Sequence, residues 1–353
     1  MTSETADKTY ILVLNWNNWQ DTIECLESVF QNSYANYQVV VIDNGSTDSS
    51  ENKIREWAAG KIVIISPYVE YAGHNKAIPL IRYSKEEGER GGEIEKEKPL
   101  YPLLRASVSH PLIFIQTGGN LGYASGNNVG LRFVLSRGDG DFIWILNNDT
   151  VIAKDALEEL LRCAESDIDI GMVGSKLLYY DKPNLLQAAG GCRLNPFLGN
   201  SVLIASNHRD DGDWDNYLEP DYISGASLLI KKRALEVLGL LDENYFLYWE
   251  DADWGARAVR KQYRLLYCPK SRVWHKEGGT SGGINPTTDY YWTRNGLLFM
   301  KKFYPFLLPL IPFSYLVKYT IVRAIKKQPL HLRAFLRGSI DFIKGKTGEK
   351  QTL

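Results

Sequence analysis

Short apolar segments alternate with amphipathic ones through the first 150 residues, and this alternation limits the possible folds more than any other feature. The apolar segments cover residues 10–14, 38–42, 112–116 and 142–146 and are rich in Val, Ile and Leu. An amphipathic stretch at 20–31 follows the first of them. Strands that are apolar throughout are buried on both faces, which is typical of parallel sheets covered by helices. The sequence therefore predicts an α/β fold with a mainly parallel sheet flanked by helices.

Length and local composition indicate how the chain is divided. A chain of 353 residues favours one large domain with an appendage, and we place the domain at 8–295 and a C-terminal helical segment at 296–353. Residues 61–66 are expected to form a third strand. Residues 82–98 contain 11 charged residues of 17 without apolar periodicity, which predicts an exposed, mobile part of an insertion spanning about 68–111.

The C-terminal segment is both basic and apolar. It carries 11 Lys and Arg against 2 Asp and Glu, although the whole chain has a formal charge of -1. Prolines and a lysine interrupt its apolar stretch 303–322, which argues against a plain membrane-spanning helix. The neighbouring Lys326, Lys327, Arg333 and Arg337 suit the headgroup layer of an anionic membrane. A helical pair packed on the domain, or a contact between two copies of the chain, is the alternative.

Other features bear on location and partners. The four cysteines lie far apart without a Cys-x-x-Cys pair, so we expect neither a zinc knuckle nor a disulfide scaffold. The polar residues 1–9 do not resemble a secretion signal. We therefore expect a cytoplasmic protein at the inner face of the cell membrane. No motif that reads nucleic acid is present in the basic segment, so a nucleic-acid partner is not expected.

Polar clusters follow the predicted strands, where ligands of open α/β sheets bind. Asn15 follows the first strand, and Asp43 begins the cluster Asp-Asn-Gly-Ser after the second. Asn120 and Gly122 belong to a Gly- and Asn-rich loop that allows close backbone approach and precedes a helix whose free N–H groups suit an anionic or ribose group. Each cluster is also compatible with an ordinary turn.

The next strand ends in Asn147, Asn148 and Asp149. A carboxylate with two amides supplies oxygen donors of the kind that hard divalent cations prefer. One carboxylate alone is weak evidence, and a capped turn before the next helix explains the same residues.

The segment 248–254 places Glu250, Asp251 and Asp253 within four positions, flanked by tryptophans. Such carboxylates repel one another unless they are solvated, cap a helix, transfer protons or bind a cation. The flanking tryptophans favour a partly buried cleft. His275 follows a later strand-like segment, where it is either an imidazole ligand or a hydrogen-bonded core histidine.

The order of these motifs resembles the inverting family 2 glycosyltransferases with a GT-A fold, especially the rhamnosyltransferase and galactofuranosyltransferase branch. The resemblance covers about residues 8–300 apart from the charged insertion. It implies that Asp251 is the catalytic base and that Asp149 and His275 bind Mn²⁺ or Mg²⁺. It further implies a nucleotide-sugar pocket made of Asn15, Asp43, Asn120, Gly122, Asn147, Asn148, Glu250 and Arg294. Asn147 stands where the family motif has an aspartate, which removes one charge from the predicted metal site.

The implied reaction transfers a sugar from a UDP- or dTDP-sugar to a hydroxyl of a saccharide or lipid-linked saccharide, in the synthesis of a cell-surface polysaccharide or glycan. A homo-oligomer is compatible with it. A sugar nucleotidyltransferase is a weaker alternative, because residues 15–20 lack a Gly-rich, basic triphosphate loop. A non-catalytic nucleotide- or carbohydrate-binding homologue is the second alternative, although such a protein does not need the Glu250-Asp251 pair.

Overall fold

The predicted apolar segments lie side by side in one large sheet. The computed structural model describes residues 7–104, 108–276, 285–309, 321 and 328–350. The strands of this sheet are β1 (Thr9–Asn15), β2 (Tyr37–Asp43), β3 (Leu80–Ser84), β4 (Leu112–Gln116), β5 (Phe142–Asn147), β6 (Thr150–Ile152), β7 (Ile170–Tyr179), β8 (Lys182–Ala189), β12 (Ser227–Lys231) and β13 (Arg264–His275). Their order is β3-β4-β2-β1-β5-β12-β7-β13-β6, and β8 pairs with β7.

The remaining elements cover the sheet or extend it. A smaller sheet contains β9 (Gly191–Asn195), β10 (Asn200–Leu203) and β11 (Tyr222–Ile223). The helices are α1 (Trp19–Val29), α2 (Ser50–Ala58), α3 (Lys85–Glu89), α4 (Ile94–Glu97), α5 (Gly122–Arg137), α6 (Ala156–Glu165), α7 (Lys232–Leu238), α8 (Glu250–Arg260), α9 (Pro286–Phe303) and α11 (Pro329–Ile343), with 3₁₀ turns η1 (Gly73–Asn75) and η2 (Lys98–Leu103).

The first half of the sheet is parallel, as predicted. β1 pairs in parallel with β2 and β5, and β4 lies in parallel between β2 and β3. The register places Asn15 beside Asp43 and Asp43 beside Gln116 at the carboxyl ends. β12 runs antiparallel between β5 and β7. Polar residues from separate motifs therefore meet along one edge of the sheet.

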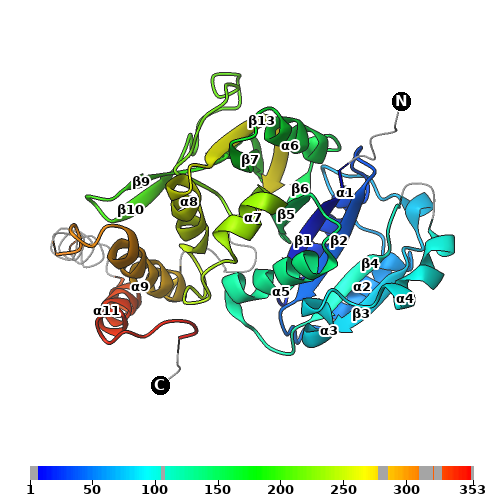
Figure 1. Ribbon diagram of the computed structural model, residues 1–353, viewed down its shortest axis with the longest axis horizontal. Helices are drawn as coiled ribbons and strands as arrows, with labels where there is room; N and C mark the ends of the chain where they lie inside the picture. The colour runs from blue at the N-terminus through cyan, green and yellow to red at the C-terminus, as the bar shows by residue number, and fades with distance from the viewer. Residues whose placement is uncertain (1–6, 105–107, 277–284, 310–320, 322–327, 351–353) are drawn as a thin grey trace.

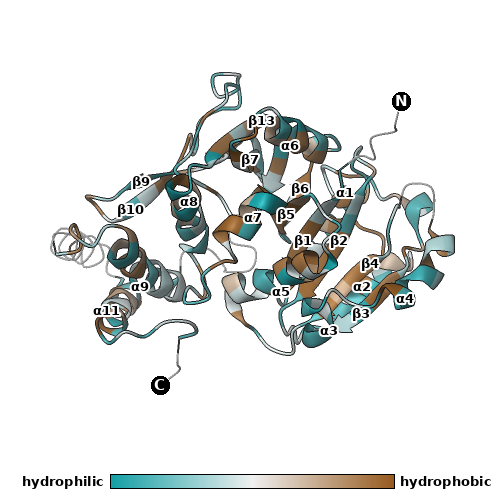
Figure 2. Cartoon of the chain, viewed as in Figure 1, coloured by the Kyte–Doolittle hydropathy of each residue, from teal (hydrophilic) through white to brown (hydrophobic). Residues whose placement is uncertain are grey.

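Burial on both faces explains why the strands are apolar throughout. In β1, Ile11 and Val13 join a core under α1, α2 and α6, whereas Tyr10 and Leu12 join a second core under α5, α7 and α8. Their side chains are fully buried. Figure 2 shows the same arrangement, with hydrophobic colour on the central strands and hydrophilic colour on outward helix faces. Alternate residues of the strand therefore pack against the helices on opposite faces of the sheet.

Two predictions of local structure in the N-terminal half are wrong. Residues 61–66 form no strand, because β3 occupies the sheet edge beyond β4 instead, and Ile65 is 98% exposed. The charged stretch 82–98 is not an unstructured insertion, since it contains parts of β3, α3 and α4. Its acidic residues find partners elsewhere: buried Glu97 accepts a hydrogen bond from the Tyr83 hydroxyl at 2.8 Å and pairs with Arg137 of α5.

The C-terminal helices pack on the body on both sides of the boundary expected between residues 295 and 296. α9 runs continuously across that expected boundary. Its Phe299 packs with Trp249, which precedes α8, at a ring distance of 5.1 Å. α11 lies against α9, where an added Cβ at Gly338 would be 2.7 Å from the Tyr290 carbonyl oxygen. Figure 1 shows both helices at the end of the molecule opposite β3 and α2 to α4.

Much of the predicted membrane-binding stretch lies outside the described residues. This applies to 310–320 and 322–327, which include Lys326 and Lys327. None of the helices in the described part of the chain combines the length and hydropathy that a membrane span needs.

Candidate active site

Asp43 lies at the end of β2, between the ends of β1 and β4. Its Oδ1 accepts a hydrogen bond from Asn15 Nδ2 at 2.7 Å, and its Oδ2 accepts one from Gln116 Nε2 at 2.6 Å. Asn15 is fully buried, and its Oδ1 also accepts a bond from the Thr22 hydroxyl at 2.7 Å. The Asn15 amide is therefore bonded inside the protein, where it positions Asp43, and a contact with the nucleotide stays a prediction.

Ser46 and Asn44 follow Asp43 and hold the loops around it. The Ser46 hydroxyl accepts a bond from Asn15 Nδ2 at 3.0 Å. Asn44 Nδ2 donates to Asn120 Oδ1 at 3.1 Å, which joins the loop after β2 to the loop after β4. The backbones of the two loops also touch, since a Cβ at Gly45 would lie 2.5 Å from Gly119. The turn after β2 is therefore a packed structural element.

The Gly- and Asn-rich loop is equally well braced. Asn120 Oδ1 accepts a further bond from the Gly122 N–H at 2.9 Å, so the Asn120 side-chain oxygen is used within the loop. Gly122 has φ of +80°, and a Cβ there would lie 2.4 Å from the Phe246 carbonyl oxygen. Glycine is required at this position because both the backbone conformation and the close approach exclude a side chain.

Asp149 and His275 come together because of strand pairing. β6 begins directly after Asp149 and runs antiparallel to the end of β13, with Thr150 opposite His275. As a result, His275 Nε2 lies 3.1 Å from Asp149 Oδ1. The two residues are 126 positions apart in the chain, so only the sheet brings the predicted ligand pair together.

The two asparagines before Asp149 have different partners. Asn147 Nδ2 lies 3.5 Å from His275 Nε2, next to the ligand pair. Asn148 is buried, and its Nδ2 donates to the Thr22 hydroxyl of α1 at 2.9 Å. Asn148 therefore ties the turn to α1, and Asn147 is the one that faces the candidate metal position.

Asp149 and His275 fit a divalent cation. Neighbouring ligands of an octahedral ion with bonds of about 2.1 Å are about 3 Å apart, close to the 3.1 Å between Asp149 Oδ1 and His275 Nε2. Oxygen and imidazole nitrogen together suit Mn²⁺ and, less well, Mg²⁺. Within the described ranges, no group of three or more His, Cys, Asp or Glu side chains is arranged for a metal, so other ligands would have to come from outside these side chains.

Asp251 is placed in the first turn of α8 with its carboxylate partly exposed. Its Oδ2 accepts a bond from the Gly225 N–H at 3.2 Å and its Oδ1 accepts one from the Ala252 N–H at 2.8 Å. Burial raises the pKa of Asp251 to about 6, although these backbone N–H groups oppose the shift. A carboxyl with this pKa is ionised at neutral pH and still basic enough to accept a proton.

The turn that holds Asp251 also reaches the other strand ends. The Gly225 carbonyl oxygen accepts a bond from the Tyr123 hydroxyl at 2.7 Å, and the Ala226 carbonyl oxygen accepts one from the Asn147 N–H at 3.1 Å. Burial, followed by the charges of nearby carboxylates that include Asp251, raises the pKa of Tyr123 well above its usual value. Hydrogen bonds through the 225–226 turn therefore link Asp251, the glycine-rich loop and the Asn147 turn.

The other two carboxylates of the motif differ sharply from Asp251. Asp253 is fully buried and forms ion pairs with Arg257 at 2.7 Å and Lys302 at 2.6 Å, so it stabilises the packing of α8. Glu250 is 5% exposed, and its Oε2 has no hydrogen-bond partner in the part of the chain that the structure describes. Burial, and next the charge of Asp251, raise the pKa of Glu250 well above its usual value.

A strained turn sets the direction in which α8 begins. Tyr248 and Trp249 have φ of +67° and +76°, conformations that cost free energy for residues with side chains. Asn295 of α9 holds this turn, since its Nδ2 donates to the Leu247 and Tyr248 carbonyl oxygens at 2.8 and 3.1 Å. The sequence offered no signal for Asn295, because the contact joins residues far apart in the chain.

The side chain of Arg294, predicted to line the nucleotide-sugar pocket, is buried beside other residues of α9. Its side chain is 1% exposed, its Nε donates to Asn295 Oδ1 at 2.9 Å, and its guanidinium lies over the rings of Tyr290 and Tyr291. Neither Nη atom has a hydrogen-bond partner among the described residues. No described contact joins Arg294 to Asp149, His275 or Asp251, so its assignment stays a prediction.

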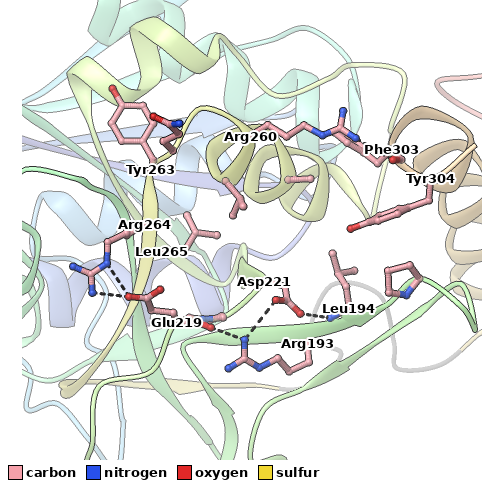
Figure 3. Close-up of a pocket in the computed structure, with 15 residues that line it drawn as sticks. Arg193, Leu194, Glu219, Asp221, Arg260, Tyr263, Arg264, Leu265, Phe303 and Tyr304 are labelled. Atoms are coloured by element: carbon pink, nitrogen blue, oxygen red, sulfur yellow. Dashed lines mark hydrogen bonds and ion pairs between the residues drawn. The ribbon is translucent and has the colours of Figure 1, made fainter.

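A cavity of about 800 Å³ lies away from these residues, at the C-terminal end of α8 (Figure 3). Arg260, which lines it, is about 14 Å along the helix from Asp251 at 1.5 Å per residue. Its charged groups are paired within the wall, for example Arg264 with Glu219 at 2.5 Å. The cavity is therefore separate from the candidate active site.

Comparisons with known proteins agree with this geometry. Residues 10–77 match the model of the family described as glycosyl transferase family 2, and residues 116–285 match that of glycosyltransferase-like family 2. The two matches cover about two thirds of the chain and include the strand-end motifs, Asp251 and His275. The chain belongs to glycosyltransferase family 2.

Similar curated proteins fall in the rhamnosyl- and hexosyltransferase part of this family. A low-salt glycan biosynthesis hexosyltransferase from Haloferax volcanii is 27% identical over 47% of this chain and 52% of its own length. A dTDP-rhamnosyl transferase from Shigella flexneri is 25% identical over 65% of this chain and 78% of its own length. An N-acetylglucosaminyl-diphospho-decaprenol L-rhamnosyltransferase from Mycobacterium tuberculosis is 24% identical over 48% and 60%. The chain thus matches about half of the first relative's length.

The fold is that of the GT-A glycosyltransferases. A mannosyltransferase from Pyrobaculum calidifontis, solved with GDP-mannose and Mn²⁺, superimposes with a TM-score of 0.53 over 97% of this chain and 89% of that one. The sequence identity is 13%, so this similarity concerns the fold alone. The predicted parallel sheet with flanking helices is confirmed.

Proposed function

We propose that this family 2 chain transfers a sugar, with inversion, from a UDP- or dTDP-sugar to a hydroxyl of a saccharide or lipid-linked saccharide in glycan synthesis. The observation that carries the proposal is Asp251, a partly exposed carboxylate with a pKa of about 6. It is connected through the 225–226 turn to the strand ends that carry the Asp149 and His275 pair. A base beside a nucleotide-binding sheet edge suits transfer to a hydroxyl.

In the proposed reaction, the acceptor oxygen attacks the anomeric carbon of the donor from the face opposite the diphosphate. The new carbon–oxygen bond forms as the bond to the diphosphate breaks, and the electron pair leaves with the diphosphate. Asp251 accepts the proton of the attacking hydroxyl. A single displacement of this kind inverts the configuration at the anomeric carbon.

A divalent cation forms part of the proposal. Asp149 and His275 would hold it, and Asn147 lies beside them. When bound, Mn²⁺ or Mg²⁺ would supply positive charge that stabilises the negative charge developing on the diphosphate. The donor diphosphate would supply further ligands, so the protein would need to contribute only two side chains. The Mn²⁺ in the solved mannosyltransferase supports this assignment.

The donor and acceptor classes draw support from the relatives. One is named for dTDP-rhamnose, and another for an acceptor with a sugar linked through diphosphate to decaprenol. UDP and dTDP, the two donor nucleotides, differ by a methyl group on the base and a ribose hydroxyl, and the proposal includes both.

A lipid-linked acceptor requires a position at the membrane, and α11 offers a surface for it. The face that packs inward carries Ala334, Phe335 and Gly338. The opposite face carries an apolar stripe of Leu336, Ile340 and Ile343, which are 41%, 49% and 80% exposed.

Basic side chains border this stripe. Arg333 and Lys344 are exposed beside it, and Arg337 is partly exposed, whereas Asp341 is buried on the inward face. Because apolar area and positive charge lie together, we propose an anionic lipid surface as the partner, with the protein on the inner face of the cell membrane.

In a flotation assay with phosphatidylglycerol vesicles, replacing the stripe residues by Ser should abolish binding. Equal flotation of native and variant chains would contradict this surface.

The test of the main proposal is calorimetric titration with UDP, dTDP, GDP and CMP, each with and without Mn²⁺. Native protein should bind UDP or dTDP more tightly with Mn²⁺, and Asp149→Ala should lose this dependence. Asp213→Ala, at an exposed aspartate, is the matched control and should bind as the native protein does. Failure to bind any of the nucleotides would contradict the transferase proposal and favour a non-catalytic member of the family.

A further inference from the structure

We infer that Gln187 is a positioning residue that holds the His275 ring with Nε2 directed at the metal position. The inference rests on the proposed function, since it concerns the residue that would bind the cation. It goes beyond the predicted ligand set, because Gln187 belongs to none of the motifs that the sequence singled out.

The contact itself is short and buried. Gln187 Oε1 lies 2.7 Å from His275 Nδ1, and Gln187 is 7% exposed. On the other side of the ring, Nε2 lies 3.1 Å from Asp149 Oδ1. The imidazole therefore lies between the Gln187 amide and the carboxylate with which it would share a cation.

A bulge in β8 explains how the side chain arrives there. Leu178 of β7 pairs with Leu186, but Leu177 pairs with Ala188, so Gln187 is an additional residue opposite β7. β7 also pairs with β13, which carries His275 at its end. Bulges redirect side chains next to active sites, and here the additional residue is the one that reaches the histidine.

The chemistry of the amide decides which ring nitrogen carries the proton. An amide oxygen only accepts, so Gln187 Oε1 requires a proton on His275 Nδ1 and leaves the Nε2 lone pair for a cation. The reverse amide orientation would place the proton on Nε2, between the imidazole and Asp149, and would block the metal position. Such outer partners of a metal-binding histidine fix its tautomer and strengthen the ligand.

Two substitutions separate positioning from packing. Gln187→Met keeps the length and much of the volume of the side chain but lacks the amide oxygen. Gln187→Glu keeps an acceptor at the same place. If Gln187 only fills space, both variants should behave alike; if it accepts the Nδ1 proton, the glutamate should rescue what the methionine loses.

The first measurement is Mn²⁺ affinity by calorimetry, in the presence of saturating UDP or dTDP. Loss of a residue that hydrogen-bonds a metal-binding histidine typically weakens metal binding about 10–100-fold, and we expect a loss of this size in Gln187→Met. Gln187→Glu should bind Mn²⁺ within a few-fold of the native protein. Native affinity in the methionine variant, or equal loss in both variants, would overturn the inference.

The second measurement needs no metal. With ¹⁵N-labelled histidine, the ring nitrogens of the five histidines are observed by NMR, and His275 is assigned from its absence in His275→Asn. The native chain and Gln187→Glu should show a protonated Nδ1, whereas Gln187→Met should show the proton on Nε2. A native ring without a proton on Nδ1 would overturn the inference. Absence of Mn²⁺ binding by the native chain would instead contradict the metal step of the proposed function, and the NMR result would still decide the role of Gln187.

Discussion

The loops around Asp43 and the start of α8 differ in how their polar groups are satisfied. Around Asp43, both carboxylate oxygens accept bonds from amides, and the adjoining loops are joined backbone to backbone. At the start of α8, Glu250 has a buried oxygen without a partner among the described residues, and Asp251 has a raised pKa. The polar groups of the first region are hydrogen-bonded within the protein. In the second region, burial of the Glu250 and Asp251 carboxyls costs electrostatic free energy, which a proton, cation or substrate would offset.

The largest expected effect tests the unsatisfied region directly. Asp251→Asn should lower turnover by about 10²–10⁴-fold, because an amide cannot accept the hydroxyl proton. Nucleotide binding should stay close to native. In the native protein, kcat/KM should fall as pH drops through about 6, since the base must be ionised. Full turnover in the variant would remove Asp251 from the mechanism.

The second effect concerns the cation. Asp149→Ala should weaken Mn²⁺ binding by at least about 100-fold in the presence of UDP or dTDP, more than the loss expected for an outer partner. Binding is measured by calorimetry, with Asp213→Ala as control. Unchanged Mn²⁺ affinity would contradict the assignment of Asp149 as a metal ligand.

The third effect concerns the loops around Asp43. Gly45→Ala should lower the free energy of unfolding by about 2 kcal/mol or more, because a Cβ would lie 2.5 Å from the Gly119 backbone in a conformation with φ of +74°. Gly118→Ala is the matched control, since φ is +81° there but nothing lies within 4 Å. Denaturant unfolding should show a larger loss for Gly45→Ala. Equal losses would mean that the loop contact contributes nothing beyond the backbone conformation.

The smallest expected effect is a change in how the free energy of unfolding depends on pH. Because the pKa of Glu250 is raised in the folded protein, the folded state binds more protons than the unfolded state at pH values above the usual glutamate range. Native stability should therefore fall as pH rises through this window, and Glu250→Gln should reduce that fall, because the amide does not titrate. Denaturant unfolding at pH 5 and pH 8 measures it. Parallel curves for both proteins would show that Glu250 is already satisfied.

Local patterns predicted the elements that carry the site. The apolar segments became β1, β2, β4 and β5, and their polar ends meet at one edge. The prediction was wrong where a run of charged residues was interpreted as an exposed segment. Glu97 lies in this charged stretch but is buried against Arg137. A run of charged residues does not reveal whether another element supplies their partners.

The site residues divide in the same way. Asp149 and His275 lie side by side, and Asn15 bonds to Asp43, while their roles toward a metal and a nucleotide stay predictions. Gln187 and Asn295 were not predicted at all. Each contributes through hydrogen bonds to residues distant in the chain, and an isolated Gln or Asn has no periodicity or spacing that marks it.

By itself, the sequence determined which segments are strands buried on both faces, and which carboxylates, amides and histidine follow them. Hydrophobic burial and turn chemistry are local properties, so they can be read from neighbouring residues. Only the tertiary structure decided which carboxylate is paired, which is left with a raised pKa, and that a bulge turns Gln187 toward His275. These properties depend on strand register and on the surroundings of each charge, which are set by contacts between residues far apart in the chain.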